Sequence, residues 1–275
     1  MFKFLCLGSG SSGNCYCLWT EHGCIIIDAG LGMRTIKRHF QAYGLSFHNV
    51  LAVLVTHDHA DHIKSVGKLA ADFNIPIYAT RAVHEGINKN YCVSPKVHEE
   101  HQRYIEKDAK FTVGDFNVTP FDIPHDSTDC VGYHVEAKGI TFCLMTDVGH
   151  ITERVRSEVE AANYLVLESN HDKEMLMEGP YPAYLKDRIS GPMGHLSNNE
   201  AAQVLGESAG PNLKHVWLCH LSEENNHPEL ARKTVDAYLR SLGIVAGVDF
   251  QLDVLKRRVP SQIYELHNEQ LLLDM

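Results

Sequence analysis

A short segment directly after an apolar run concentrates side chains that bind metal ions. The run covers residues 50–55, and three imidazoles and two carboxylates follow it: His57, Asp58, His59, Asp61 and His62. Neutral imidazole and ionised carboxylate are good ligands for zinc, manganese or iron, whereas unpaired charges at a buried strand end would be costly. Residues two apart on an extended segment point the same way. His57 and His59 therefore share one side, while Asp61 and His62 can face a second ion. The alternative is a solvated loop rich in histidine.

This spacing resembles the HxHxDH signature of the metallo-β-lactamase superfamily. The remaining ligands of that superfamily can be sought downstream, where each is expected at the end of a strand. Three candidates occur in the expected order, each after an apolar segment: His125, Asp147 and His220. Asp28, which follows the apolar residues 24–27, matches the early aspartate that supports the site in that superfamily. Each residue alone would be a weak signal, but together they extend the resemblance over nearly the whole chain.

The resemblance implies a site for two divalent metal ions. The expected ligands are His57, His59 and His125 for one ion and Asp61, His62 and His220 for the other, with Asp147 as a bridge. A water shared by the ions would then act as the hydroxide nucleophile of a hydrolysis reaction. Asp58 lies inside the signature and is expected to stabilise that water or a ligand. We therefore count Asp58, together with Asp61, among the candidate catalytic residues.

Two further residues indicate phosphodiester hydrolysis. Glu168 ends an apolar segment, and His195 lies just before an expected helix. Ser197 and Glu200 fit a capping box, which predicts that this helix begins at about Asn198 and seats a phosphate near its positive end. Glu168 and His195 resemble a pair used by ribonuclease Z-like and ribonuclease J-like phosphodiesterases. That resemblance implies that His195 protonates the leaving oxygen and that Glu168 orients it; a capping or salt-bridge role is the alternative for Glu168.

The loop Gly8–Asn14, between two expected strands, is rich in glycine and serine. It is not a dinucleotide-binding fingerprint, because a strand rather than a helix follows it. Its small residues leave room beside the metal ions, and its amides and hydroxyls can bond phosphate oxygens. The expected phosphate contacts are Ser11, Ser12 and Asn14, together with Ser197. A plain flexible hairpin turn is the alternative.

Four stretches together resemble one branch of the superfamily, the YycJ-like proteins: 8–14, 168–172, 179–182 and 194–198. That resemblance implies a metal-dependent DNA exonuclease that works in the 5′→3′ direction, with a proposed part in mismatch repair. His171 and Asp172 are typical of the branch, and we expect them to support the site or to cap a helix. The interval from Asp147 to His220 is too short for the inserted domain of ribonuclease J-type enzymes, which counts against RNA processing.

The net charge supports a second candidate function. The net charge of −10 argues against nucleic-acid binding by the overall field of the protein. A hydrolase of a small molecule, such as a cyclic phosphodiester, a lactone or a thioester, fits this charge better. A di-iron oxidoreductase would usually carry a carboxylate in place of His59, and a metal-free scaffold would lack ligands. The resemblance to the YycJ-like branch nevertheless favours a DNA phosphodiesterase, and metal identity and oligomeric state stay open.

The elements that must position these residues alternate between short apolar strands and amphipathic helices. The expected strands are 2–7, 15–20, 23–28, 50–55, 76–79, 116–121, 131–137, 140–146, 164–168 and 213–219. The expected helices are about 32–43, 60–73, 150–161, 172–178, 181–190, 198–209 and 228–242. Strands followed by helices, twice over, predict an α/β fold, a four-layer αβ/βα sandwich with two mixed sheets flanked by helices. No linker divides the chain, so we expect one domain, 1–275.

Composition predicts a soluble, cytoplasmic protein. Of the 275 residues, 44% are hydrophobic and 22% are charged, which is typical of globular proteins. No segment approaches the ~20 consecutive apolar residues of a membrane span. The first seven residues are too short an apolar stretch for a secretory signal. The eight cysteines lie at irregular positions, so reduced thiols are expected rather than disulfides.

Overall fold

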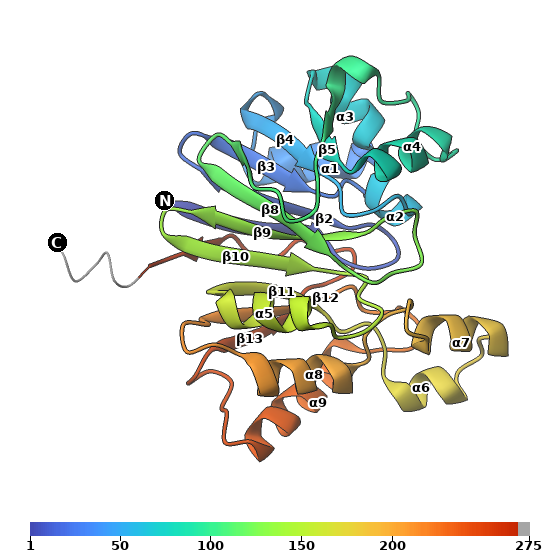
Figure 1. Ribbon diagram of the computed structural model, residues 1–275, viewed down its shortest axis with the longest axis vertical. Helices are drawn as coiled ribbons and strands as arrows, with labels where there is room; N and C mark the ends of the chain where they lie inside the picture. The colour runs from blue at the N-terminus through green and yellow to red at the C-terminus, as the bar shows by residue number, and fades with distance from the viewer. Residues whose placement is uncertain (269–275) are drawn as a thin grey trace.

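The computed structural model describes residues 1–268, and in this part of the chain two seven-stranded mixed sheets pack face to face (Figure 1). The first sheet contains, in spatial order, β14 (Tyr264–Leu266), β1 (Phe2–Gly8), β2 (Cys15–Thr20), β3 (Gly23–Ile27), β4 (Val50–Leu54), β5 (Ile77–Ala79) and β6 (Gln102–Tyr104). The second contains β13 (Gln251–Val254), β12 (His215–Cys219), β11 (Tyr164–Glu168), β10 (Ile140–Met145), β9 (Val131–Ala137), β8 (Phe116–Asp122) and β7 (Phe111–Val113).

Helices cover the outer faces of both sheets, and the predicted four-layer sandwich is thereby confirmed. The first sheet carries α1 (Met33–Ala42), α3 (Val66–Phe73) and α4 (Arg81–Lys89), and the second carries α5 (Glu153–Ala161), α8 (Asn198–Ser208) and α9 (Pro228–Ser241). The shorter helices are α2 (Ala60–Ile63), α6 (Lys173–Glu178), α7 (Ala183–Ser190) and the 3₁₀ helices Phe47–Asn49 and Glu99–His101. No helix within residues 1–268 combines the length and the apolar character that crossing a bilayer requires.

The central strands are buried on both faces, which explains why they read as continuous apolar runs. Along β1, the side chains of Phe2, Phe4 and Cys6 enter the core between the two sheets. Leu5 and Leu7 point the other way and pack in the layer between the first sheet and its helices. Because successive side chains of a strand point to opposite faces, β1 contributes apolar side chains to both layers.

The helix expected over residues 60–73 is wrong as one continuous element, because it is divided into α2 and α3. The carbonyl of Asp61 accepts a hydrogen bond from the backbone N–H of Asn14 at 2.8 Å, and that of His62 accepts from Ala29 at 2.7 Å. The N–H of Ser65 donates to the carbonyl of Ala29 at 2.8 Å instead of continuing the helix. Neighbouring loops therefore capture the backbone groups that a longer helix would need. This capture holds Asp61 and His62 at the sheet edge.

Candidate metal centre

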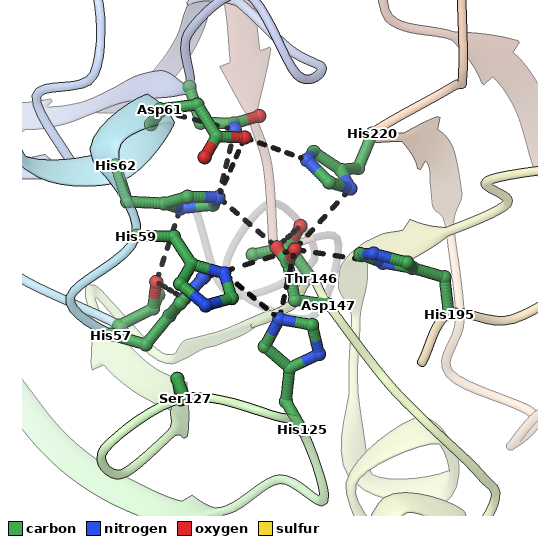
Figure 2. A network of polar contacts seen from close by, with 12 residues as sticks. His57, His59, Asp61, His62, His125, Ser127, Thr146, Asp147, His195 and His220 are labelled. Atoms are coloured by element: carbon green, nitrogen blue, oxygen red, sulfur yellow. Dashed lines mark hydrogen bonds and ion pairs between the residues drawn. The ribbon is translucent and has the colours of Figure 1, made fainter. Parts of the chain in front are cut away.

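The predicted metal ligands converge at one edge of the paired sheets, where several strands end. β4 leads into the segment His57–His62, while β8, β10 and β12 lead to His125, Asp147 and His220. β8 and β10 both pair antiparallel with β9, and β10, β11 and β12 are mutually parallel, so their carboxyl ends share one edge. Figure 2 shows Asp147 at the centre of a group of imidazole rings from both sheets.

One set of ligand atoms comes from His57, His59 and His125, whose ring nitrogens lie within 4.8 Å of one another. Nε2 of His125 is 3.3 Å from Nδ1 of His59. Nε2 of His57 is buried and, within the described chain, has no hydrogen-bond partner. Burial, together with the neighbouring imidazole of His62, holds the pKa of His57 well below its usual range. A neutral, unpartnered imidazole nitrogen is the state that binds a divalent ion.

A second set comes from Asp61, His62 and His220. Oδ2 of Asp61 lies 3.6 Å from Nε2 of His62 and 3.4 Å from Nε2 of His220. The three groups belong to both sheets, since α2 follows β4 and His220 follows β12. A carboxylate with two imidazoles is a donor set that suits zinc, manganese and iron alike.

Asp147 lies between the two sets. Its Oδ1 is 3.7 Å from Nε2 of His125 and 4.0 Å from Nε2 of His57. Its Oδ2 is 3.3 Å from Nε2 of His62 and accepts a hydrogen bond from the hydroxyl of Thr146 at 2.7 Å. Burial alone would raise the pKa of this carboxyl group, but the surrounding imidazoles hold it well below its usual range. The carboxylate therefore offers one charged oxygen to each set.

Asp28 orients the proposed ligand His62 through a hydrogen bond. Its carboxylate accepts hydrogen bonds from the backbone N–H and the hydroxyl of Thr56, each at 2.8 Å, and from Nδ1 of His62 at 2.7 Å. Because Nδ1 donates to Asp28, Nε2 of His62 faces Asp147. Burial alone would lower the pKa of His62, but the carboxylates of Asp147 and Asp28 raise it to about 9. A divalent ion on Nε2 would satisfy the same negative charges.

Three residues of the site have left-handed backbone conformations. The φ angles are 59° at Asp28, 56° at Asp147 and 54° at His220, and within residues 1–268 only three other non-glycine residues have positive φ. Such conformations cost about 1–3 kcal/mol each and persist where the surroundings enforce them. At His220 the backbone N–H donates to the hydroxyl of Ser9 at 2.9 Å. Each of the three residues stands directly after a strand or one residue beyond it, where the turn swings its side chain into the site.

Glu168 and His195 form a pair beside the ligands. Nδ1 of His195 donates to Oε1 of Glu168 at 2.9 Å, and the same oxygen accepts from Nδ1 of His220 at 3.0 Å. The other oxygen of Glu168 accepts from the backbone N–H groups of Val148 and Leu196. Burial alone would raise the pKa of Glu168, but the charge of His195 and these hydrogen bonds lower it to about 2. The carboxylate is therefore fixed in place and charged.

Asp58, which is expected to stabilise the shared water or a ligand, has its side-chain hydrogen-bond partners in the described chain outside the ligand sets. Its carboxylate accepts hydrogen bonds from the hydroxyl of Thr128 at 2.5 Å and from the backbone N–H of Thr128 at 3.2 Å. A Cβ atom on Gly86 of α4 would come within 1.9 Å of Oδ2 of Asp58, so only glycine fits there. The reason is the alternation of an extended segment, which turns Asp58 away from the side shared by His57 and His59. Asp58 thus joins two loops and makes no direct contact with the ligand sets.

The expected phosphate contacts separate into two groups. Ser11 lines the cavity at the ligands, and Ser12 is exposed nearby in the sequence. Asn14 is buried, and its side chain bonds Gly10 and lies 3.0 Å from Nε2 of His62. Ser197 is buried and completes the predicted capping box with Glu200, so α8 begins at Asn198 as expected. Asn14 and Ser197 therefore have internal partners, which is a correction to the phosphate contacts expected of them.

His171 and Asp172 lie outside the ligand sets. Asp172 caps α6 by accepting hydrogen bonds from the backbone N–H groups of Glu174 and Met175. His171 is buried, and neither of its ring nitrogens has a hydrogen-bond partner in the described chain. Burial lowers the pKa of His171 to about 4, so the ring is neutral at pH 7. The capping role expected for Asp172 agrees with this geometry, whereas direct support of the site by His171 does not.

A cavity of about 240 Å³ opens onto the ligands. The predicted site residues in its lining are Ser11, His59, Asp61, Asp147, His195 and His220. The lining residues that the sequence analysis did not single out are Asn170, Tyr181, Leu185, Arg188, Ile189 and Ser222. Asn170 donates a hydrogen bond to the carbonyl of His220 at 2.8 Å. Tyr181 lies within a stretch that is typical of the YycJ-like branch, which was a usable signal. Nothing in the sequence around Arg188 marks it, because only the fold brings α7 to the cavity.

Comparison with known proteins agrees with this architecture. Residues 24–220 match the family described as the beta-lactamase superfamily domain. The crystal structure of the metallo-beta-lactamase fold protein YhfI from Bacillus subtilis superposes with a TM-score of 0.69 at 19% identity, covering 95% of this chain and 100% of that one. At this identity the likeness concerns the fold alone.

Two curated relatives are more similar in sequence. The exodeoxyribonuclease YycJ of Bacillus anthracis is 34% identical over 262 residues, which cover 94% of this chain and 97% of the relative. The exodeoxyribonuclease WalJ of Streptococcus pneumoniae is 34% identical over 251 residues, covering 91% and 93%. The chain therefore belongs to the metallo-β-lactamase superfamily, in the group that includes YycJ and WalJ.

Proposed function

We propose that this chain is a metal-dependent phosphodiesterase that digests DNA in the 5′→3′ direction. The observation that carries the proposal is the position of Asp147, with one oxygen toward each ligand set and the Glu168–His195 pair beside it. Hydrolysis of a phosphodiester needs an activated water and a proton for the departing oxygen. The relatives named exodeoxyribonucleases support DNA as the substrate.

The residues of the site fit divalent metal ions. A buried imidazole nitrogen of His57 has no other partner in the described chain, and the donors are those that zinc, manganese and iron accept. We infer two ions, held by His57, His59 and His125 and by Asp61, His62 and His220, with Asp147 shared. When bound, two such ions would activate a water and stabilise the charge that develops on the phosphate oxygens. Asp28 would keep His62 oriented for this purpose.

His195 is the proposed proton donor. Nδ1 of His195 donates its hydrogen bond to Glu168, so Nε2 is the nitrogen available to give a proton to the leaving sugar oxygen. Burial alone would lower the pKa of His195, but the charge and the hydrogen bond of Glu168 raise it. The imidazole therefore keeps its proton more readily near neutral pH. Glu168 acts through His195 and His220 and is a positioning residue.

We also propose that the reaction takes place in the cytoplasm as part of DNA repair. All eight cysteines lie within the described residues, all are free, and seven are buried. Free buried thiols fit a reducing compartment. An exonuclease that starts at a 5′ end would remove the strand beside a lesion or a mismatch, which is the basis for the proposed role in repair.

The test is digestion of duplexes labelled at the 5′ or the 3′ end, with manganese added to the purified protein. We expect early release of the 5′ label as mononucleotide and late release of the 3′ label. Asp147→Ala should release neither label and serves as the control for a contaminating nuclease. Release of the 3′ label first would contradict the direction, and intact DNA throughout would contradict the substrate.

A second candidate is the hydrolysis of a small molecule. The net charge of −10 and the volume of the cavity, about 240 Å³, favour a substrate smaller than DNA. The same protein should therefore be tested with a cyclic phosphodiester, a lactone and a thioester. A higher kcat/KM on any of these than on DNA would favour this second candidate.

A further inference from the structure

The segment between β11 and α8 builds one wall of the cavity. It contains α6 and α7, which project from the body of the protein beside the metal edge (Figure 1). No residue of α7, which is described throughout, is buried. Leu185, Arg188 and Ile189 line the cavity, and their spacing of three and four places them on one face of this helix. Tyr181, just before α7, lines the cavity as well.

The lining of the cavity also includes proposed metal ligands and the proposed proton donor. His59, Asp61, Asp147, His195 and His220 all contribute to its lining. A group seated at these residues would therefore also contact the wall formed by α7. The wall combines one aromatic ring, two aliphatic side chains and one guanidinium group. This combination is complementary to a nucleotide, which carries a flat base, a sugar and a charged phosphate.

Arg188 is held in a fixed position at this wall. Its Nε and Nη2 donate to the two carboxylate oxygens of Asp126, at 2.5 and 3.0 Å. Asp126 follows the ligand His125, and its Oδ1 lies 3.5 Å from Nε2 of that ring. A guanidinium group has five N–H donors, so three remain after the pair with Asp126 is made. The side chain of Arg188 is 51% exposed, which leaves these donors accessible.

Charge singles out Arg188 further. The protein carries a net charge of −10, so a DNA strand must be attracted by positive groups close to the site rather than by the overall charge. Among the described residues, Arg188 is the only lysine or arginine that lines the cavity. Hydrogen bonding to Asp126 raises the pKa of Arg188, and the nearby charge of Asp61 adds to the effect. Arg188 thus places a permanent positive charge, paired with the carboxylate of Asp126, in the lining of the cavity.

We propose that Tyr181 and Arg188 bind the nucleotide next to the bond that is cut, with the ring of Tyr181 stacked on a base and the guanidinium of Arg188 on a flanking phosphate. This inference rests on the proposed function, because it assumes a DNA strand in the cavity. Aromatic stacking is tolerant of sequence, and a guanidinium group reads phosphate rather than base. The wall therefore binds DNA of any sequence.

The experiment compares wall variants with neighbours on the same helix. The wall variants are Tyr181→Ala and Arg188→Ala. The control variants are Tyr184→Ala, which removes a side chain that is 74% exposed, and Lys186→Ala, which removes a hydrogen bond to the carbonyl of Met177. Neither control residue lines the cavity. We measure kcat and KM of the metal-loaded proteins on 5′-phosphorylated DNA and on bis(p-nitrophenyl) phosphate, a diester that carries neither a nucleobase nor a flanking phosphate. Metal content is measured for every variant, since Arg188→Ala frees the carboxylate of Asp126.

We expect each wall variant to raise KM for DNA roughly tenfold, from the loss of one stacked base or one charged phosphate contact. Activity on the small diester and metal content should stay within about twofold of wild type, a margin well below the tenfold step. Tyr181→Phe and Arg188→Lys should recover part of the loss, because a ring or a charge remains. Both control variants should behave as wild type.

The inference is overturned if the wall variants digest DNA like wild type, or if they lose DNA and small-diester activity equally. The proposed function can fail separately. If the wild-type protein cleaves the small diester but no DNA, the proposed substrate is wrong and the wall inference falls with it. If wild type digests DNA and the wall variants do so equally well, only the wall inference is wrong.

Discussion

The two sheets contribute to the site in different ways. The first sheet supplies four proposed ligands within one short segment after β4, and the buried carboxylate of Asp28 orients one of them. The second sheet supplies three proposed ligands from the ends of three strands, and the buried carboxylate of Glu168 orients the last of them. Asp28 contacts no other imidazole of the site, whereas Glu168 also holds His195.

This difference assigns different tasks to two similar carboxylates. Asp28 acts on His62, a proposed ligand, and so affects the binding of metal. Glu168 acts on His220, a proposed ligand, and on His195, the proposed proton donor, and so connects metal binding to proton transfer. On this proposal, the first sheet would bind metal only, and the second sheet would bind metal and also carry the acid. Variants can separate these tasks.

Among the variants that separate these tasks, the largest effect is expected for His195→Ala. Loss of a positioned general acid costs ~10²–10⁴-fold in rate, and His195 belongs to neither proposed ligand set. Turnover of DNA should therefore fall by that factor, while elemental analysis finds the metal content of wild type. Unchanged turnover would refute the role as proton donor, and a loss of metal would place His195 among the ligands.

Glu168→Gln should affect both tasks of the second sheet. The charge of Glu168 helps to raise the pKa of His195, whose protonated form is the proposed donor, so kcat of wild type should fall as pH rises through that pKa. Without the charge, the pKa of His195 drops, and the alkaline limb of the kcat profile should move to lower pH. Metal affinity should fall about 10–100-fold, because the orientation of His220 is weakened. An alkaline limb that stays in place would separate Glu168 from proton transfer.

Asp28→Asn should affect metal binding alone. The hydrogen bond that orients His62 loses its charged acceptor, and metal affinity is expected to fall about 10–100-fold. With saturating manganese, kcat and its pH profile should match those of wild type. A shifted pH profile would show that both carboxylates act on the acid and would remove the contrast between the two sheets.

Ser197→Ala is expected to have the smallest effect. Its hydroxyl and the side chain of Glu200 form the capping box of α8, and loss of such a cap costs about 1 kcal/mol of unfolding free energy. Urea unfolding should report this loss while KM for DNA remains that of wild type. A raised KM without a loss of stability would restore the phosphate contact that the sequence analysis expects of Ser197.

The contrast between the sheets also explains what the sequence could predict. The segment 57–62 is recognisable alone because its ligands are contiguous, and His125, Asp147 and His220 become recognisable only through the resemblance to a family. Alternation along the extended segment was sufficient to turn Asp58 away from the site, but the family signature suggested a role for it. Long apolar strands were predicted well, because burial on both faces leaves a continuous signal.

The remaining differences come from tertiary contacts that no local pattern encodes. The strands β6, β7, β13 and β14, with three or four residues each, are absent from the sequence-based prediction, and so is α4. The division between α2 and α3 depends on hydrogen bonds from Asn14 and Ala29, which are distant in sequence. Arg188 lines the cavity only because the fold brings α7 to it. Short elements and the position of α7 therefore required the structure.

Metal content measured per chain, for wild type and Asp147→Ala, tests the central claim most directly. The claim is that one carboxylate, placed between the ligands of the two sheets, completes a site for two ions. Elemental analysis of the protein after equilibration with manganese or zinc should give two ions per wild-type chain and a loss of both metal and turnover in Asp147→Ala. Two ions retained by an active Asp147→Ala protein would contradict the account.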